Sequence, residues 1–286
     1  MNLPSRLSHL YMHLKQALLA AGIDTAERDT RLMIRRHTGF DWSDFVTSPE
    51  QGVTRDHLSL IESDVERRLS GMPLSRMYGE RGFWGLDFKL NPHTLDPRPD
   101  TETLVEAALN NLSKTPPATI LDLGTGSGCI LIALLSEWKD AHGVGIDRSF
   151  DAVIQARENA VMNGVDGRAH FCCGSWVDAI DARFDLIVSN PPYISNRDIP
   201  YLSPEVKNHD PILALDGGDD GYDAYREILM KMKDLMNPGA TALLEIGYGQ
   251  ETEVVRLAIN AGLLVKDVHP DLSGIARVVE ISRGDK

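Results

Sequence analysis

The fold of this 286-residue chain is decided by the stretch Thr119-Ile-Leu-Asp-Leu-Gly-Thr-Gly-Ser-Gly-Cys-Ile-Leu-Ile-Ala-Leu-Leu135. An apolar strand pattern leads into a glycine-rich turn, and an apolar helix pattern follows. This order is typical of the first strand, turn and helix of a nucleotide-binding type of α/β sheet. The glycines let the backbone approach a ligand, and the start of the helix presents free N–H groups. The stretch therefore predicts an α/β domain that binds one edge of a ligand at this turn.

The spacing of the glycines argues against two common ligand classes. A dinucleotide site requires G-x-G-x-x-G, whereas Cys129 occupies the place of the third glycine here. The chain also lacks the G-x-x-x-x-G-K-[ST] run of a phosphate-binding loop. Nicotinamide, flavin and nucleoside triphosphate sites are therefore disfavoured.

A second apolar strand, predicted over His142–Asp147, ends in a carboxylate. The two oxygens of Asp147 suit a pair of ribose hydroxyls. The alternative is that Asp147 only caps the next helix, although Ser149 stands nearby as a competing cap. We expect Asp147 to face the same ligand as the glycine turn.

The segment Asn190-Pro191-Pro192-Tyr193 follows another buried-strand pattern, Phe184–Ser189. The Asn190 side-chain oxygen and the Pro191 main-chain oxygen offer two acceptors, and proline stiffens the backbone between them. Two acceptors suit one NH2 group, and Tyr193 could lie against a flat amide or base. The alternative is an ordinary turn at the end of a strand, since Asn-Pro is a common turn dipeptide.

Further strand patterns alternate with helical segments along the rest of the chain. We predict them over His170–Cys173, Phe184–Ser189, Ala240–Ile246, Leu264–His269 and Arg277–Ser282. The last two lie close together in sequence, as expected of a final antiparallel hairpin. The fold class is therefore α/β, with the glycine turn, Asp147 and Asn190 at the carboxyl edge of one sheet.

The chain divides into parts. Residues 1–75 show helical spacing of leucines after position 7 and again after a Thr54 cap, which predicts a small helical bundle in which Asp24 caps one helix. Residues 76–96 contain a run from about Phe83 to Leu95 that alternates apolar and polar residues, which predicts a connecting β-hairpin. Residues 97–286 form the predicted catalytic domain.

Charge is concentrated in the predicted catalytic part. Residues 1–80 hold 10 Lys and Arg against 11 Asp and Glu, so −12 of the total net charge of −13 lies in the rest. Such a field repels a phosphate backbone. A basic protein partner or a small substrate fits better than nucleic acid, although acidity can also serve solubility alone.

No apolar run is long enough to suggest a membrane span, and residues 1–20 lack the layout of a signal peptide, so we expect a cytoplasmic protein. Cys129, Cys172 and Cys173 have no metal-ligand spacing. We expect no metal site, and we expect the cysteines to be buried small apolar residues.

Taken together, these motifs resemble those of class I S-adenosylmethionine-dependent methyltransferases, and within them the peptide chain release factor glutamine methyltransferases, the HemK/PrmC family. The resemblance covers the chain from about residue 71 to the C-terminus. It extends through segments outside the three sites, namely Met72–Gly79, Phe83–Phe88, Pro97–Glu102 and Ala214–Gly221.

The resemblance implies a Rossmann-like, seven-stranded, mostly parallel sheet and an N-terminal helical domain that recognises a protein substrate. It also implies methylation of the glutamine amide nitrogen in the Gly-Gly-Gln loop of release factors. The implied catalytic residues are Asn190, Pro191, Pro192 and Tyr193. The residues implied to bind S-adenosylmethionine, and its product S-adenosylhomocysteine, are Asp122, Gly124, Thr125, Gly126, Ser127, Gly128, Asp147, Trp176 and Asn190.

Alternatives remain open at this point. A ribosomal-protein glutamine or an exocyclic amine of a nucleic-acid base presents the same planar NH2 group to the Asn190 segment. A cofactor-binding scaffold without turnover is a third possibility. Trp176 could be a core residue, and Arg98, Asp100, Glu102, His209 and Asp210 are weaker candidates near the site. We expect a monomer whose partners are release factors, without direct contact to nucleic acid or membrane.

Overall fold

A computed structural model describes residues 3–177 and 180–284. The chain separates into two compact units between Tyr78 and Gly79. The boundary therefore lies after Tyr78, whereas the sequence analysis ended the helical bundle at residue 75. The hairpin expected within residues 76–96 belongs to the C-terminal unit.

The N-terminal unit is helical. Leu7, Leu10, Leu14 and Leu18, on one face of its first helix, are fully buried in a core shared with other helices of the unit. This burial confirms the helical spacing read from the sequence. The helices are α1 (Leu7–Ala20), α2 (Ala26–Thr38), α3 (Trp42–Thr47), α4 (Arg55–Leu69) and α5 (Leu74–Tyr78).

The start of α2 differs from the prediction. The N-cap residue is Thr25, not Asp24, and its side chain does not cap the helix. The Thr25 hydroxyl instead donates to Asp29 Oδ2 at 2.8 Å, and Asp29 forms a buried ion pair with Arg68 at 2.8 Å. The hydroxyl is therefore used to satisfy a buried charge, which needs hydrogen bonds more than the helix end does.

The C-terminal unit is built on one sheet, whose described strands follow the order β5-β4-β3-β6-β7-β9-β8. The pairs among β5, β4, β3, β6 and β7 are parallel, whereas β9 runs antiparallel to both of its neighbours. This arrangement confirms the predicted Rossmann-like, mostly parallel sheet with a final antiparallel hairpin. The strands are β3 (Thr119–Leu123), β4 (His142–Asp147), β5 (Ala169–Cys173), β6 (Phe184–Ser189), β7 (Met236–Glu245), β8 (Leu264–Pro270) and β9 (Ala276–Ser282).

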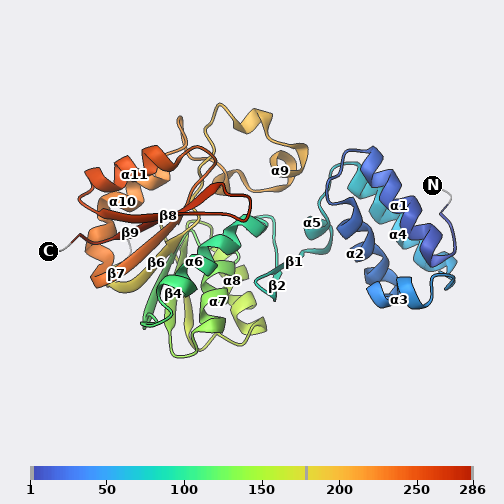
Figure 1. The fold of residues 1–286 in the computed structure, drawn as a ribbon, viewed down its shortest axis with the longest axis horizontal. Helices are drawn as coiled ribbons and strands as arrows, with labels where there is room; N and C mark the ends of the chain where they lie inside the picture. Colours follow the sequence, from blue (N-terminus) through green and yellow to red (C-terminus); the bar gives the residue numbers. More distant parts are fainter. Residues whose placement is uncertain (1–2, 178–179, 285–286) are drawn as a thin grey trace. The chain divides into compact units, whose positions relative to one another are not determined.

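Both faces of this sheet are covered by helices (Figure 1). Alternate residues of a strand point to opposite faces. Accordingly Ile120 packs into the core beneath α6, α7 and α8, whereas Leu121 packs into the core beneath α10 and α11. These helices are α6 (Glu102–Asn111), α7 (Cys129–Glu137), α8 (Phe150–Met162), α10 (Asp223–Leu235) and α11 (Glu251–Asn260), and the short α9 spans Pro204–His209.

Strand register brings the ends of three strands to one level. Leu123 at the end of β3 pairs with Ile146 of β4 and with Ser189 of β6. The residues that directly follow Leu123, Ile146 and Ser189 are Gly124, Asp147 and Asn190, respectively. The carboxyl edge of the sheet is where open α/β folds bind ligands.

A two-stranded hairpin precedes this sheet in sequence. It consists of β1 (Glu80–Phe83) and β2 (Leu86–Lys89), paired antiparallel. Trp84 and Gly85 form its turn with φ angles of 52° and 70°, as a tight hairpin turn with two left-handed residues requires. The observed hairpin therefore begins before Phe83 and ends before Leu95, the limits expected from the alternating run.

The cysteine prediction is partly wrong. Cys129 is buried, but Cys172 and Cys173 are exposed. The reason is that β5 is an edge strand of the sheet, so its last residues lack a covering neighbour on one side.

Candidate active site

The glycine turn after β3 is held in a backbone shape that requires glycine. Gly124, Gly126 and Gly128 have φ angles of 75°, 55° and 81°, in the left-handed region. A Cβ atom on Gly124 would lie 3.3 Å from the Trp176 ring, and one on Gly128 would lie 2.9 Å from Ile132 Cδ1. The turn therefore combines unusual dihedral angles with close packing on both sides.

Asp147 joins the end of β4 to this turn. Its Oδ2 accepts a hydrogen bond from Gly126 N at 2.8 Å, and its Oδ1 accepts one from Ser149 N at 2.9 Å. Burial raises the pKa of this carboxyl above its usual value, although these main-chain donors oppose the shift. Ser149 is the N-cap residue of α8 and accepts from Ala152 N at 3.2 Å, so capping does not explain Asp147.

Asp122 lies beneath the turn and does not line the cavity described below. It is fully buried, and its Oδ2 accepts the Thr125 hydroxyl hydrogen at 2.7 Å. Burial raises the pKa of Asp122 to about 7. Asp122 therefore holds Thr125 from beneath the turn and does not face the cavity. The sequence analysis had expected it to contact the ligand.

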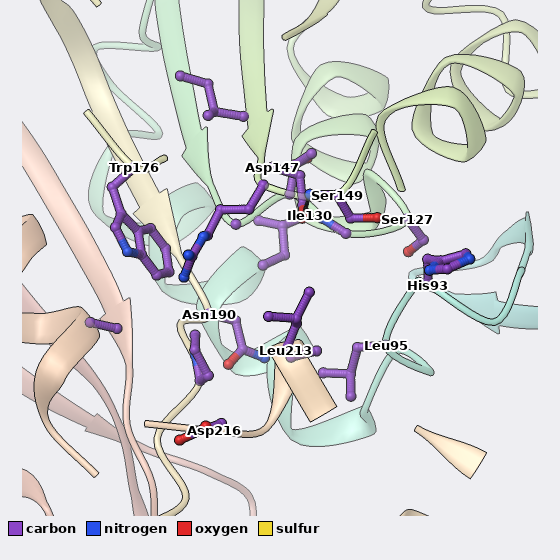
Figure 2. Close-up of a pocket in the computed structure, with 18 of the residues that line it drawn as sticks. His93, Leu95, Ser127, Ile130, Asp147, Ser149, Trp176, Asn190, Leu213 and Asp216 are labelled. Carbon is purple, nitrogen blue, oxygen red and sulfur yellow. Dashed lines mark hydrogen bonds between the residues drawn. The ribbon is translucent and has the colours of Figure 1, made fainter. Parts of the chain in front are cut away.

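A cavity of about 430 Å³ opens over the glycine turn. Figure 2 shows Asp147 and Ser149 on one side of it, Ser127 and His93 on another, and Asn190 across from them. The predicted residues that line it are Gly124, Thr125, Gly126, Ser127, Asp147, Trp176, Asn190 and Pro192. Gly128 and Pro191 are absent from its lining. Its volume lies within the range of about 300–1,000 Å³ usual for small-molecule sites.

Trp176 forms a wall of this cavity (Figure 2). Its φ of 42° is uncommon for a bulky residue, and such strain gathers at functional sites. The residue is 9% exposed and also belongs to the core beneath α10. Trp176 is therefore both a core residue and a flat apolar surface toward the cavity.

Asn190 lies where the first cavity meets a second one of about 350 Å³. Its Nδ2 donates to the Thr101 hydroxyl oxygen at 3.1 Å. Because this bond uses the nitrogen side of the amide, the Asn190 oxygen remains available as an acceptor. Tyr193 lines the second cavity only, and burial raises the pKa of its hydroxyl to about 12, so it stays neutral.

Charged residues surround the second cavity. Arg277 pairs with Asp100 at 2.8 Å, and Arg98 pairs with Asp210. Arg98 lines both cavities. The weaker candidates Arg98, Asp100 and Asp210 therefore form ion pairs at this rim.

Glu102 has a structural explanation. Its Oε1 accepts from the main-chain N–H of Trp84 at 2.8 Å, which fixes the turn of the hairpin. His209 ends α9 and lines neither cavity. Neither Glu102 nor His209 lines either cavity.

Sequence reasoning missed three residues that hold the Asn190 segment in place, namely Thr101, Glu245 and Gln250. Gln250 Nε2 donates to the Tyr193 main-chain oxygen at 3.0 Å. Thr101 and Glu245 are each 2% exposed and lie beside Asn190. Only the strand-end position of Glu245 could have drawn attention to it, because β7 ends at the same edge as β6.

The cavity has features that suit S-adenosylmethionine. The hydroxyl of Ser127 is buried, lines the cavity and lacks a hydrogen-bond partner among the described residues. A buried hydroxyl without a partner is uncommon and indicates a polar ligand group beside it. The Asp147 carboxylate suits ribose hydroxyls, the glycine turn offers close approach, and Trp176 offers a flat surface.

Within residues 3–177 and 180–284, no group of three or more His, Cys, Asp or Glu side chains is arranged to hold a metal ion. In the same ranges, every helix is too short or too polar to cross a bilayer.

Together, the sheet order and this edge-located site define the fold of a class I methyltransferase. Two family models match the chain, "Methyltransferase small domain" over residues 100–202 and "PrmC N-terminal domain" over residues 9–79. The chain belongs to the family of release factor glutamine methyltransferases. One relative of that name, from Agrobacterium fabrum, is 43% identical over 94% of each chain. Another, from Bradyrhizobium diazoefficiens, is 44% identical over 92% of this chain and 90% of its own.

Solved structures share the fold at low identity. A methyltransferase from Pyrococcus furiosus matches 78% of this chain and 100% of its own with a TM-score of 0.55 and 18% identity. A ribosomal protein L11 methylase from Lactobacillus delbrueckii subsp. bulgaricus matches 66% of this chain and 81% of its own, with a TM-score of 0.50 and 19% identity. These likenesses concern the fold alone.

Proposed function

We propose that this protein methylates the side-chain amide nitrogen of the glutamine in the Gly-Gly-Gln loop of peptide chain release factors. The methyl donor is S-adenosylmethionine and the second product is S-adenosylhomocysteine. The observation that carries the proposal is the position of Asn190, which borders both cavities and has its amide oxygen available. The family relatives, named release factor glutamine methyltransferases, support the choice of substrate.

In this proposal the first cavity holds the methyl donor. Asp147 accepts from the ribose hydroxyls, the glycine turn approaches the methionine part, and Trp176 covers the adenine. Ser127 provides a further hydroxyl for a polar group of the ligand. The role of Asp122 is indirect, because it holds Thr125 from beneath.

The target nitrogen is held by acceptors. The Asn190 side-chain oxygen and the Pro191 main-chain oxygen accept the two hydrogens of the glutamine NH2, which aims the nitrogen at the methyl group. S-adenosylmethionine supplies a methyl on a positively charged sulfur, and the electrons of the broken C–S bond stay on that sulfur. The new N–C bond makes the N–H groups more acidic, so the two acceptors bind the transition state more strongly than the ground state. The nitrogen then loses one proton to water, and no side-chain base is required.

The domain roles belong to the same proposal. The helical unit up to Tyr78 recognises the release factor. The hairpin segment up to residue 96 connects it to residues 97–286, which bind the methyl donor and carry out the transfer. We infer a monomer that acts in the cytoplasm on a protein substrate. The net charge of −13 supports a basic protein partner over nucleic acid.

The test is to incubate the purified protein with methyl-labelled S-adenosylmethionine and, separately, release factor, ribosomal proteins, RNA and DNA. Label is then mapped by mass spectrometry. The expected result is label on the glutamine of the Gly-Gly-Gln loop. Label only on a ribosomal protein or on nucleic acid would overturn the proposed substrate, and absence of label from every sample would favour a scaffold.

Asn190→Ala removes one of the two acceptors that hold the target nitrogen and so tests their role. We expect a fall in kcat of about 100-fold, comparable to the loss of one oxyanion-hole group, with binding of the methyl donor largely retained. The matched control is Asn260→Ala at the exposed end of α11, which lines neither cavity and should leave kcat unchanged.

A further inference from the structure

Glu245 is a buried acid without a role in the mechanism above. It is the last residue of β7, is 2% exposed and borders the second cavity. Its Oε2 has no hydrogen-bond partner among the described residues. A buried carboxyl oxygen that lacks a partner costs free energy, so the position of this acid beside Asn190 calls for an explanation.

The hydroxyl of Thr101 connects Glu245 to Asn190. Thr101 Oγ1 accepts from Asn190 Nδ2 at 3.1 Å, and the side chain is 2% exposed, so water has little access to it. A hydroxyl carries one hydrogen, which needs an acceptor of its own. The Glu245 carboxyl lies beside both side chains, whose hydrogen-bonding groups favour its charged form, so it can accept that hydrogen.

We propose that Glu245 is a positioning residue: through Thr101 it holds the Asn190 amide with its NH2 group toward the protein and its oxygen toward the target nitrogen. This inference rests on the proposed function. It extends that function by naming the group that sets the orientation of the Asn190 amide. An amide turned by half a rotation would present hydrogens to the glutamine NH2, and two donors do not bind each other.

The charge of Glu245 matters because an ionised carboxylate can only accept hydrogen bonds. A protonated carboxyl can donate to Thr101, and the Thr101 hydrogen can then turn to the Asn190 oxygen, which allows the amide to flip. Burial raises the pKa of Glu245 to about 7, with Asp100 adding to the rise and Arg277 opposing it. The other titratable groups near it are Cys129, Tyr193 and Tyr225, whose pKa values burial also raises, so all three stay neutral.

The first experiment compares Thr101→Val with Thr101→Ser. Both keep a small side chain, but only serine keeps the hydroxyl. We expect Thr101→Ser to retain kcat within about twofold and Thr101→Val to lose about tenfold, in line with one lost buried hydrogen bond. Affinity for S-adenosylmethionine, measured by calorimetry, should change little in either. Equal kcat values in the two variants would overturn the inference.

The second experiment uses the pH profile of kcat, with release factor as the substrate. Wild-type kcat should fall below a midpoint near 7 and level off about tenfold lower, because protonation of Glu245 loosens the same link that Thr101→Val removes. Glu245→Gln should lower kcat and remove this acid limb. An unchanged acid limb in Glu245→Gln would contradict the role of Glu245, and thermal unfolding of each variant verifies folding.

A third readout does not depend on turnover, so it separates this inference from the proposed function. The side-chain NH2 resonances of Asn190, assigned by their loss in Asn190→Ala, should shift with pH around 7 in the wild type and stay constant in Glu245→Gln. That result would support the inference even if the release factor were the wrong substrate. Resonances that do not respond to pH in the wild type would overturn it.

Discussion

Gln250 Nε2 donates a hydrogen bond to the main-chain oxygen of Tyr193 at 3.0 Å. The same side chain accepts from Gly247 N through Oε1 at 3.0 Å. One amide therefore links the loop after β7 to the end of the Asn190 segment. Because Tyr193 lines the second cavity, this link sets the shape of the wall that the target side chain meets.

Gln250→Glu is expected to reduce kcat without weakening binding of the methyl donor. The substitution keeps an acceptor for Gly247 and removes the donor to Tyr193, which leaves a partly buried carbonyl without its partner at a cost of about 1–3 kcal/mol. Steady-state kinetics with release factor and calorimetry with S-adenosylmethionine measure the two effects separately. A variant that loses both equally would show that Gln250 supports the whole fold rather than this wall.

Gly221→Ala is expected to destabilise the protein and to impair activity. Gly221 has φ +85°, and an added Cβ would lie 2.6 Å from the Tyr193 main-chain oxygen. The left-handed backbone alone costs about 1–2 kcal/mol, which corresponds to a fall in Tm of roughly 2–8 °C. The matched control is Gly167→Ala, where nothing lies within 4 Å of the added atom. Calorimetric Tm values that shift equally in both variants would contradict the packing argument.

Asp147→Asn is expected to weaken S-adenosylmethionine binding by about 10- to 100-fold, because a charge-assisted hydrogen bond to a hydroxyl contributes about 1.5–3 kcal/mol. The amide oxygen can still accept from Gly126 N, whereas the bond from Ser149 N to the other oxygen is lost, so Tm is measured alongside to verify that the turn survives. Isothermal titration measures the dissociation constant, and the exposed Asp166→Asn serves as the control. An affinity equal to that of the control would exclude Asp147 from the binding site.

Asp122→Asn is expected to flatten the pH dependence of stability. Burial raises the pKa of Asp122 from 3.8 to about 7, so the folded state holds a proton that the unfolded state has lost over this range. The stabilisation from this group is complete below the unfolded pKa and is lost as pH rises through the folded one, at about 1.4 kcal/mol per pH unit.

Urea unfolding at pH 5.5 and pH 8, without ligand, tests this sign. The free energy of unfolding of the wild type should fall more steeply between the two values than that of Asp122→Asn, by about 2 kcal/mol. Parallel changes in the two proteins would show that Asp122 ionises normally in the folded state.

Much of the sheet could be predicted from the sequence. The strands over His142–Asp147 and Phe184–Ser189 occur with the predicted bounds, because apolar residues fill them and a polar residue ends the run at the sheet edge. Strand β7 begins at Met236, before the predicted Ala240. Pro238 and Gly239, just before Ala240, are unfavourable inside strands, but the irregular register between β6 and β7 accommodates them.

The candidate site was harder to predict where contacts are nonlocal. Asp122 belongs to a glycine-turn motif and was expected to touch the ligand. The alternation of β3 places it on the opposite side from Leu121 and Leu123, which pack beneath α10 and α11. Nothing in the sequence near Thr101 points to Asn190, because the two residues meet only after the sheet has formed.

The two cavities that meet at Asn190 have largely separate walls. Asp147 and Trp176 border only the first, whereas Tyr193, Glu245 and Arg277 border only the second. Substitutions in one wall can therefore alter recognition of the acceptor while recognition of the donor is preserved. Evolution or protein design can therefore change the acceptor substrate by replacing a few of the side chains that border only the second cavity.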